Sequence, residues 1–183
     1  GYGSRGVKGK ILAVEYVRKN NIPFLGLCYG LQMATVEFAR NVCGMKGANT
    51  TEINPRTKYP VIDLMPYQKK LIKEKQYGAT NRLGAYPCTL NKNSISYKAY
   101  GKREISERHR HRYEFNNRYR KRFENNGLRI AGVYKKKNLV EIIELSNHPF
   151  FIATQFHPEF KSRPPNPHPL FREFIRAARS RDC

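Results

Sequence analysis

The chain of 183 residues is poor in acidic side chains, has no tryptophan and contains no long apolar run. Asp and Glu together number 14, against 35 Lys and Arg, which gives a formal net charge of +21. No stretch approaches the ~20 apolar residues that a transmembrane helix needs, and no signal peptide is visible. We therefore expect neither a membrane protein nor a secreted one.

Cysteine is also scarce, and its spacing excludes two common roles. The four cysteines form neither a metal-ligand pattern nor a dense disulfide framework: Cys28, Cys43, Cys88 and Cys183. This usage favours a reducing intracellular compartment, so we expect the protein in the cytoplasm. A chain of this length is expected to form one domain that buries roughly 70% of its unfolded surface.

The most informative stretch that is present is the apolar run 23–27, which leads into Gly26-x-Cys28-x-Gly30 and then into a helix-competent segment. This is the layout of a nucleophile elbow, with cysteine in place of serine. The flanking glycines let strand and helix close around a strained nucleophile. The positive end of the helix is expected to favour the thiolate. A buried structural cysteine remains the alternative for this motif taken alone.

A second apolar segment, 150–156, runs directly into His157-Pro158-Glu159. A cysteine nucleophile needs a base, and the base needs an orienting partner. Proline between the two stiffens the turn, so the carboxylate of Glu159 is expected to curl back towards the imidazole of His157. A surface histidine in a proline turn is the alternative, but the elbow cysteine in the same chain favours a catalytic pair.

Together, the segments 26–32 (Gly-Leu-Cys-Tyr-Gly-Leu-Gln) and 155–159 (Gln-Phe-His-Pro-Glu) resemble the Cys-His-Glu triad of the class I glutamine amidotransferases. The segments 1–6, 48–52, 58–62 and 107–114 resemble one branch of this family more narrowly. The string 108–114, Arg-His-Arg-His-Arg-Tyr-Glu, argues against other members such as GMP synthetase. The resemblance extends from Gly1 to about Ala178.

The resemblance implies hydrolysis of L-glutamine, with Cys28 as nucleophile, His157 as base and Glu159 as its orienting group. It implies that Tyr29 and the glycine turn at Gly1 supply oxyanion donors. Further residues are implied to bind glutamine, with the acid for its α-ammonium and the arginine for its α-carboxylate: Gly30, Leu31, Gln32, Glu52 and Arg112. His109 and His111 lack further ligands at metal spacing, so we expect no metal in this domain.

The resemblance also implies parts that lie outside this chain. The chain is expected to be a partial amidotransferase domain, 1–183, without the family's first βα units. Ammonia is expected to pass to a synthetase domain of the same polypeptide, where ATP and Mg²⁺ support amination of a pyrimidine nucleotide. GTP is the expected allosteric activator, and a homotetramer the expected assembly. The domain itself is expected to need no cofactor.

The excess of positive charge offers a competing interpretation. Nine basic side chains lie within 102–122, interleaved with aromatic residues, a pattern that is typical of an RNA-binding surface. The string that best marks the family lies inside this stretch, so we expect nucleic-acid binding to be incidental. A catalytically silent basic binding module is the remaining alternative, and the joint presence of Cys28, His157 and Glu159 argues against it.

The hydrophobic pattern predicts helices at 7–20, 29–41, 117–126 and 169–180, and strands at 23–27, 60–65, 82–90, 128–134, 139–145 and 150–156. In the last helix, Leu170, Phe171, Phe174, Ile175 and Ala178 are expected to face inward. Alternating elements followed by a strand-rich block predict an α/β fold. We expect an open, mostly parallel sheet flanked by helices, with an antiparallel strand extension, as in the flavodoxin-like fold of the family.

Overall fold

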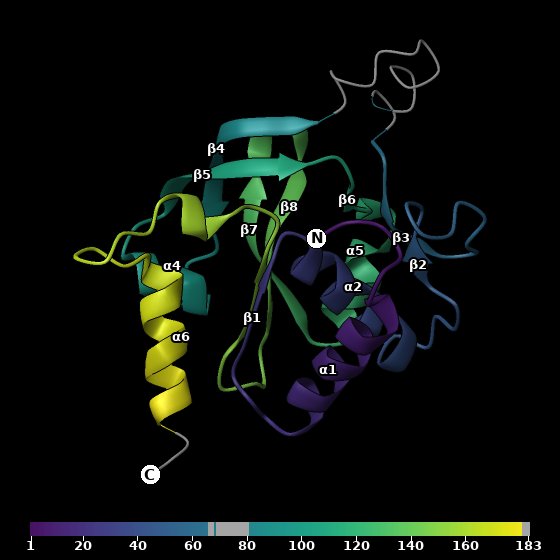
Figure 1. The fold of residues 1–183 in the computed structure, drawn as a ribbon, viewed down its shortest axis with the longest axis horizontal. Helices are drawn as coiled ribbons and strands as arrows, with labels where there is room; N and C mark the ends of the chain where they lie inside the picture. The colour runs from purple at the N-terminus through teal and green to yellow at the C-terminus, as the bar shows by residue number, and fades with distance from the viewer. Residues whose placement is uncertain (66–67, 69–80, 181–183) are drawn as a thin grey trace.

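The computed structural model describes residues 1–65, 68 and 81–180, in which two β-sheets are flanked by helices (Figure 1). The strands are β1 (Phe24–Leu27), β2 (Asn49–Thr50), β3 (Pro60–Asp63), β4 (Arg82–Leu90), β5 (Glu104–His111), β6 (Glu114–Phe115), β7 (Leu128–Tyr134), β8 (Leu139–Leu145) and β9 (Phe151–Thr154). The α-helices are α1 (Val7–Lys19), α2 (Tyr29–Asn41), α4 (Ile95–Tyr100), α5 (Arg120–Asn125) and α6 (Pro169–Arg179). Short 3₁₀ turns lie at Asn117–Tyr119, Lys135–Lys137 and Pro158–Phe160.

The larger sheet has six strands in the order β1-β9-β8-β7-β4-β5. Its β1·β9 pair is parallel, with Phe24 opposite Phe151, and its other pairs are antiparallel. Strands joined by short turns, as β7, β8 and β9 are, pair antiparallel, because a parallel pair needs a crossover connection. The α/β fold with an antiparallel extension is thus confirmed. We expected a mostly parallel sheet. Among the described strands of the larger sheet, however, only the β1·β9 pair is parallel, and the antiparallel pairs predominate.

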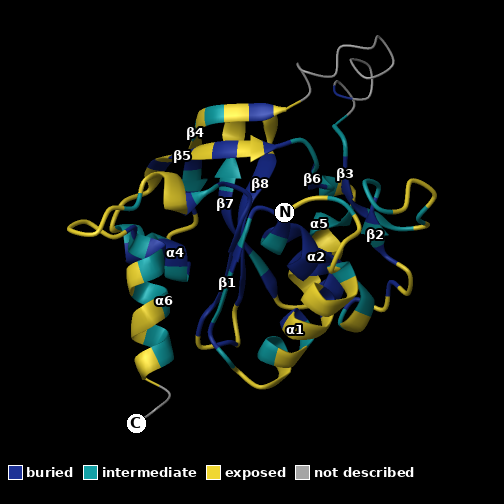
Figure 2. Cartoon of the chain, viewed as in Figure 1, coloured by how far each residue is buried: buried dark blue, intermediate teal, exposed yellow. Residues whose placement is uncertain are grey.

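Apolar side chains cover both faces of this sheet, because successive residues of a strand point to opposite sides. In β9, Phe151 and Ala153 pack into the core under α1 and α2, whereas Ile152 packs into the core under α4 and α6. Figure 2 shows the resulting buried centre between outer helices that expose their far sides. Each large aliphatic side chain that is fully buried in this way contributes about 1.5–3 kcal/mol. The two cores hold the sheet rigidly between its helical layers.

Most predicted elements are observed within a few residues of their expected ends. The segment 94–100 has no clear pattern, yet it forms α4, capped by the hydroxyl of Ser94, which accepts from the N–H of Tyr97 across 2.9 Å. The inward face predicted for α6 is wrong at one position. Ile175 is 55% exposed, because Leu170 and Phe174 already fill the contact with α4 and the sheet.

The larger sheet curls, so that the residues that follow β1 and β9 meet β5, the strand at the opposite edge. The N–H of His157, which follows β9, donates to the carbonyl of Arg108 in β5 across 2.9 Å. The thiol of Cys28, which follows β1, lies 3.9 Å from the carbonyl of Arg110 in β5. The curl therefore brings the residues after β1 and β9 against an edge strand that is remote from them in the sheet order.

Candidate active site

Cys28 sits in the sharp turn between β1 and α2, with φ 50° and ψ −96°. Among the described residues it shares a positive φ with only two others that are not glycine, Asn21 and Asn138. A Cβ added to Gly26 would lie 3.0 Å from the backbone of Gly30, so strand and helix meet this closely only because Gly26 has no side chain. The predicted elbow is therefore present, with its strain located at the cysteine.

The sulfur of Cys28 is enclosed, and only 7% of the residue is exposed. Its Sγ lies 3.9 Å from the side-chain amide of Gln155. Burial raises the pKa of the Cys28 thiol to about 11, although a hydrogen bond with the backbone of Tyr29 acts in the opposite direction. The start of α2 therefore acts in the predicted direction, but desolvation outweighs it and the net pKa of the thiol is raised.

His157 and Glu159 are placed as the sequence predicts. His157 Nδ1 lies 2.6 Å from Glu159 Oε1, and the imidazole stacks on Phe160 with ring centroids 5.0 Å apart. The other ring nitrogen of His157, Nε2, is buried and has no hydrogen-bond partner among the described residues. A carboxylate on Nδ1 leaves Nε2 as the nitrogen that can exchange a proton with a neighbour.

One cavity of about 640 Å³ brings most of the predicted site together, a volume within the range of small-molecule sites. The predicted residues that line it are Gly1, Cys28, Tyr29, Gln32, Glu52, Arg112, His157 and Glu159. Leu31 does not line the cavity, because its side chain is fully buried in the core. Gly30 is not a lining residue either and packs against β1. For these two, only the backbone remains a candidate contact.

Side chains of opposite charge, Glu52 and Arg112, line the cavity. Glu52 Oε1 accepts the N–H of Gly3 across 3.0 Å. Nε of Arg112 is buried and has no partner among the described residues. The side-chain nitrogen of Gln32 donates to the carbonyl of Tyr113 across 3.3 Å, while its Oε1 is also unpartnered. Unpaired buried polar atoms are costly, so their presence in the cavity wall indicates a polar ligand.

The sequence analysis assigned no role at this site to several other lining residues: Tyr2, Asn81, Leu83, Arg110, His111, Tyr113 and Phe160. Arg110, His111 and Tyr113 belong to the string that marks the family, so that string is the signal that could have indicated them. Asn81 and Leu83 carry no motif, and their position depends on how β4 enters the sheet. Only the fold reveals this part of the wall.

His109 and His111 contact each other instead of forming a ligand set. His109 Nδ1 lies 2.8 Å from His111 Nε2, and both residues are buried. Burial and the nearby charge of Arg82 lower the pKa of His109 to about 2 and that of His111 to about 3. In the part of the chain that the structure describes, no group of three or more His, Cys, Asp or Glu side chains could hold a metal ion.

The basic stretch 102–122 is divided among several elements. Arg108 and Arg110 project from β5, whereas the guanidinium of Arg122 donates to the carbonyl of Cys43 across 2.6 Å. Arg120 pairs with Glu124 within α5. The basic side chains therefore lie on different elements and several have partners within the chain, whereas the sequence pattern suggests one continuous basic surface.

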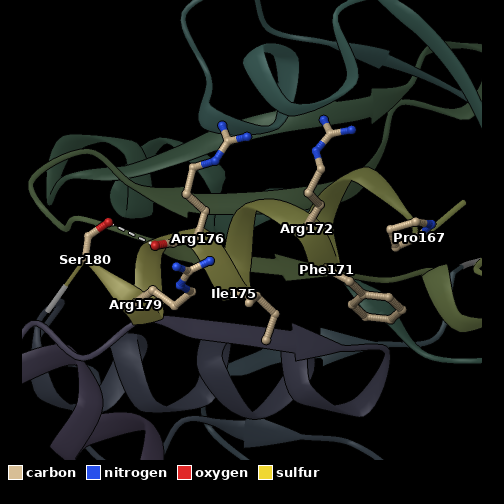
Figure 3. Close-up of a pocket in the computed structure, with 7 residues that line it drawn as sticks. All are labelled: Pro167, Phe171, Arg172, Ile175, Arg176, Arg179 and Ser180. Atoms are coloured by element: carbon tan, nitrogen blue, oxygen red, sulfur yellow. Dashed lines mark hydrogen bonds between the residues drawn. The ribbon is translucent and has the colours of Figure 1, made fainter. Parts of the chain in front are cut away.

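A larger hollow of about 690 Å³ lies along α6, lined by residues such as Phe171, Ile175 and Arg179 (Figure 3). Its polar side chains are mainly arginines, with Ser180 bonded back to the helix carbonyl of Arg176. The described residues that line this groove include no cysteine, histidine or carboxylate, and the hydroxyl of Ser180 is engaged with the helix backbone. The smaller cavity around Cys28 is therefore the candidate active site.

Residues 1–177 match the family described as Glutamine amidotransferase class-I. The chain belongs to this family. Within it, the chain is 59% identical over 177 residues to CTP synthase of Caldanaerobacter subterraneus and 61% identical over 178 residues to CTP synthase of Clostridium kluyveri. These alignments cover 97% of this chain but only 32% and 33% of the two relatives, so the chain spans about a third of their length.

Among solved structures, the glutaminase domain of Trypanosoma brucei CTPS with bound acivicin matches with a TM-score of 0.92 and 38% identity, over 98% of this chain and 69% of that one. A protein from Thermoplasma acidophilum described as a GMP synthase subunit matches with a TM-score of 0.59 and 19% identity, which shows the shared fold alone. No helix in the described ranges is long and apolar enough to cross a membrane.

Proposed function

We propose that the chain is the glutaminase part of a CTP synthase and hydrolyses L-glutamine to glutamate and ammonia. The observation that carries this proposal is a single cavity that is lined by the elbow cysteine, by the His157–Glu159 pair, and by Glu52 and Arg112. A nucleophile with a base fits amide hydrolysis, and an acid with an arginine fits the two charges of an amino acid.

The reaction starts when the Cys28 sulfur attacks the side-chain amide carbon of glutamine. Because burial keeps this thiol protonated, its proton passes to Nε2 of His157 as the bond forms. His157 then protonates the departing ammonia, which leaves a γ-glutamyl thioester on Cys28. Water, deprotonated by His157, hydrolyses the thioester to glutamate and restores the thiol. Glu159 holds the imidazole in the required tautomer throughout.

The negative oxygen of each tetrahedral intermediate needs hydrogen-bond donors. The backbone N–H of Tyr29 begins α2 directly after Cys28 and is one donor in this mechanism. The turn at Gly1, which lines the cavity, is the other. Such donors are typically worth ~3 kcal/mol each in the transition state.

Glutamine is held by its α-groups. Glu52 binds the α-ammonium and Arg112 the α-carboxylate, because charge-assisted hydrogen bonds are the strongest available to these groups. Gln32, with its unpartnered Oε1, and the backbone from Tyr29 through Gly30 to Leu31 complete the amide end of the pocket.

In the larger protein that this proposal implies, the ammonia reaches a synthetase domain of the same polypeptide. There ATP, with Mg²⁺, activates UTP for amination to CTP, the final step to a cytidine nucleotide. GTP is the proposed allosteric activator, and a cytoplasmic homotetramer is the proposed assembly. The names of the similar relatives support this part of the proposal.

The direct test is release of glutamate from L-glutamine by the chain, measured with and without GTP, alongside the Cys28→Ala variant. The proposal expects glutamate release that requires Cys28. Glutamate release that persists in Cys28→Ala would contradict the mechanism, and a folded parent chain without release in either condition would contradict the activity.

A further inference from the structure

A buried ionic cluster lies against the inward face of β5, next to the catalytic cavity, which one of its members, His111, also lines. The guanidinium of Arg82 donates to Glu114 Oε1 at 3.2 Å through Nη1 and to Glu141 Oε1 at 2.8 Å through Nη2. The three side chains are 3%, 1% and 0% exposed. The planar fork of Arg82, at the start of β4, thereby joins β6 to β8.

The same cluster holds the inner face of β5. Arg82 stands opposite His111 in the pairing of β4 with β5. His109 Nε2 lies 3.6 Å from Glu141 Oε2, and His111 Nδ1 lies 3.6 Å from Glu114 Oε1. The hydrogen bond between the two imidazoles closes the network. Both inward imidazoles in this half of β5 therefore lie near the carboxylates that Arg82 contacts, and Nδ1 of His111 has its hydrogen bond with the carbonyl of Tyr113.

The backbone of β5 meets the catalytic residues directly. The carbonyl of Arg108 accepts the N–H of His157, and the carbonyl of Arg110 lies beside the sulfur of Cys28. Their positions depend on the register of β5, because a two-residue slip moves each carbonyl by ~6.7 Å along the strand. The position of β5 along its own axis thus affects where both the nucleophile and the base lie.

Packing alone does not require such a cluster. Buried ion pairs are often replaced by apolar groups without loss of stability, because desolvation offsets their attraction. Their best-supported use is to specify one register among several that an apolar interface would accept. Here the specified strand is the one that carries the contacts with Cys28 and His157.

We propose that Arg82 is a positioning residue for glutamine hydrolysis, which fixes β5 through Glu114 and Glu141 so that the carbonyls of Arg108 and Arg110 set the distance between Cys28 and His157. The expected effect on glutamine hydrolysis rests on the proposed function. The expected effect on the position of β5 rests on geometry alone. A lysine cannot replace Arg82, because Arg82 contacts the two carboxylates through two separate nitrogens and a lysine has only one.

The test compares Arg82→Lys with Arg18→Lys in the whole chain. Arg18 is the control, because its guanidinium also pairs with a buried carboxylate, that of Glu37 at 2.9 and 2.6 Å, but this pair joins α1 to α2 and does not contact β5. Two kinds of measurement are made below the unfolding temperature: kcat and KM for glutamate release, and hydrogen exchange at the His157 amide relative to amides in α2.

For Arg82→Lys we expect kcat to fall at least tenfold, KM to change less than threefold, and exchange at His157 to rise at least tenfold. Arg18→Lys is expected to change each quantity less than twofold.

A folded Arg82→Lys variant with the parent's kcat overturns the proposal, as does a reduced kcat with unchanged exchange at His157. If Arg82→Lys does not fold, Glu141→Gln decides in its place, with the same changes expected at about threefold. Failure of both variants to fold also overturns it, because the cluster would then serve the fold as a whole. If the parent chain releases no glutamate, the proposed function fails, and exchange at His157 alone decides the positioning.

Discussion

The backbone N–H of Cys28 donates to the carbonyl of Thr154 across 2.7 Å, and Thr154 is the last residue of β9. The hydrogen bond continues the parallel pairing of β1 with β9 past the end of β1. His157 follows Thr154 by three residues. The strand that delivers the nucleophile and the strand that leads to the base are therefore joined at the point where both enter the cavity.

Covalent labelling should be selective for Cys28. Burial raises the pKa of Cys43 to about 11, as it does for Cys28, so acidity does not distinguish these thiols. Cys28 alone among the described cysteines lines the cavity with a histidine. We expect acivicin, a chloro-dihydroisoxazole amino acid that resembles glutamine, to modify Cys28 only, as read by peptide mass mapping.

The control for this labelling is the Cys28→Ala variant, which is expected to take up no reagent. An adduct on Cys43 or Cys88 would contradict the assignment of the nucleophile. Competition by L-glutamine should slow the labelling of the parent chain, because both compounds need the same α-amino and α-carboxylate contacts.

Loss of the orienting carboxylate should reduce activity without abolishing it. Glu159→Gln removes the charge 2.6 Å from His157 Nδ1 but leaves nucleophile and base in place. We expect kcat to fall roughly 10²- to 10⁴-fold, whereas Cys28→Ala leaves no measurable turnover. Glu173→Gln in α6 is the matched control and should retain full activity. Equal rates for Glu159→Gln and Glu173→Gln would remove Glu159 from the mechanism.

Arg112→Ala should act mainly on KM, because a contact with the α-carboxylate is present in both ground and transition states. Loss of such a charge-assisted pair costs ~2–4 kcal/mol, or roughly 30- to 1000-fold in kcat/KM. Exposed Arg118, which lies over the ring of Tyr119, should tolerate the same change. Steady-state kinetics of the two variants decide between a substrate contact and a surface charge.

The same pair of variants tests the RNA-binding interpretation of the basic stretch. If that surface binds RNA, both substitutions should weaken binding by similar steps and leave glutamine turnover unchanged. A selective effect of Arg112→Ala on KM favours the glutaminase. Indistinguishable kinetics for Arg112→Ala and Arg118→Ala would remove Arg112 from the site.

Glu114 should make the folded state less stable at alkaline pH. Burial, opposed by Arg82 and Lys137 and reinforced by Glu141, raises the pKa of Glu114 to about 8 from about 4.5. Between these values the folded state binds the extra proton, so its contribution is complete below about pH 4.5 and is lost as pH rises through about 8. Glu114→Gln retains a neutral group at every pH and should lack this loss.

Denaturant unfolding of the parent and Glu114→Gln, measured from pH 5 to pH 9, checks this expectation. The free energy of unfolding of the variant relative to the parent should rise up to about pH 8 and then level off. Because His109 and His111 are present in both proteins, their own titration largely cancels in the difference. A difference that is independent of pH would show that Glu114 is ionised throughout.

The sequence predicts those parts of the molecule whose structure is determined by residues close together in the chain. The bounds of α2 follow from the glycines of the elbow and the apolar pattern after them, and the strands 128–134 and 139–145 match β7 and β8 because most of their residues are apolar, many of them β-branched. The ionic cluster could not be predicted, since Arg82 meets Glu114 and Glu141 only after the sheet has formed. Ile175 was misplaced because helical periodicity does not reveal how wide a face the neighbouring layer covers.

The exposed side chains of β5 affect whether copies of the chain associate with one another. Arg108 and Arg110 project from an edge strand, whose carbonyls at these two residues face His157 and Cys28 of the same chain instead of a neighbouring molecule. Two such edges facing each other bring like charges together, so mutual repulsion opposes sheet-to-sheet stacking. This protection depends on dilute salt, because the screening length shrinks from ~10 Å at 0.1 M to ~3 Å at 1 M. The positive excess of the sequence thus acts as a barrier to aggregation that concentrated electrolyte would remove.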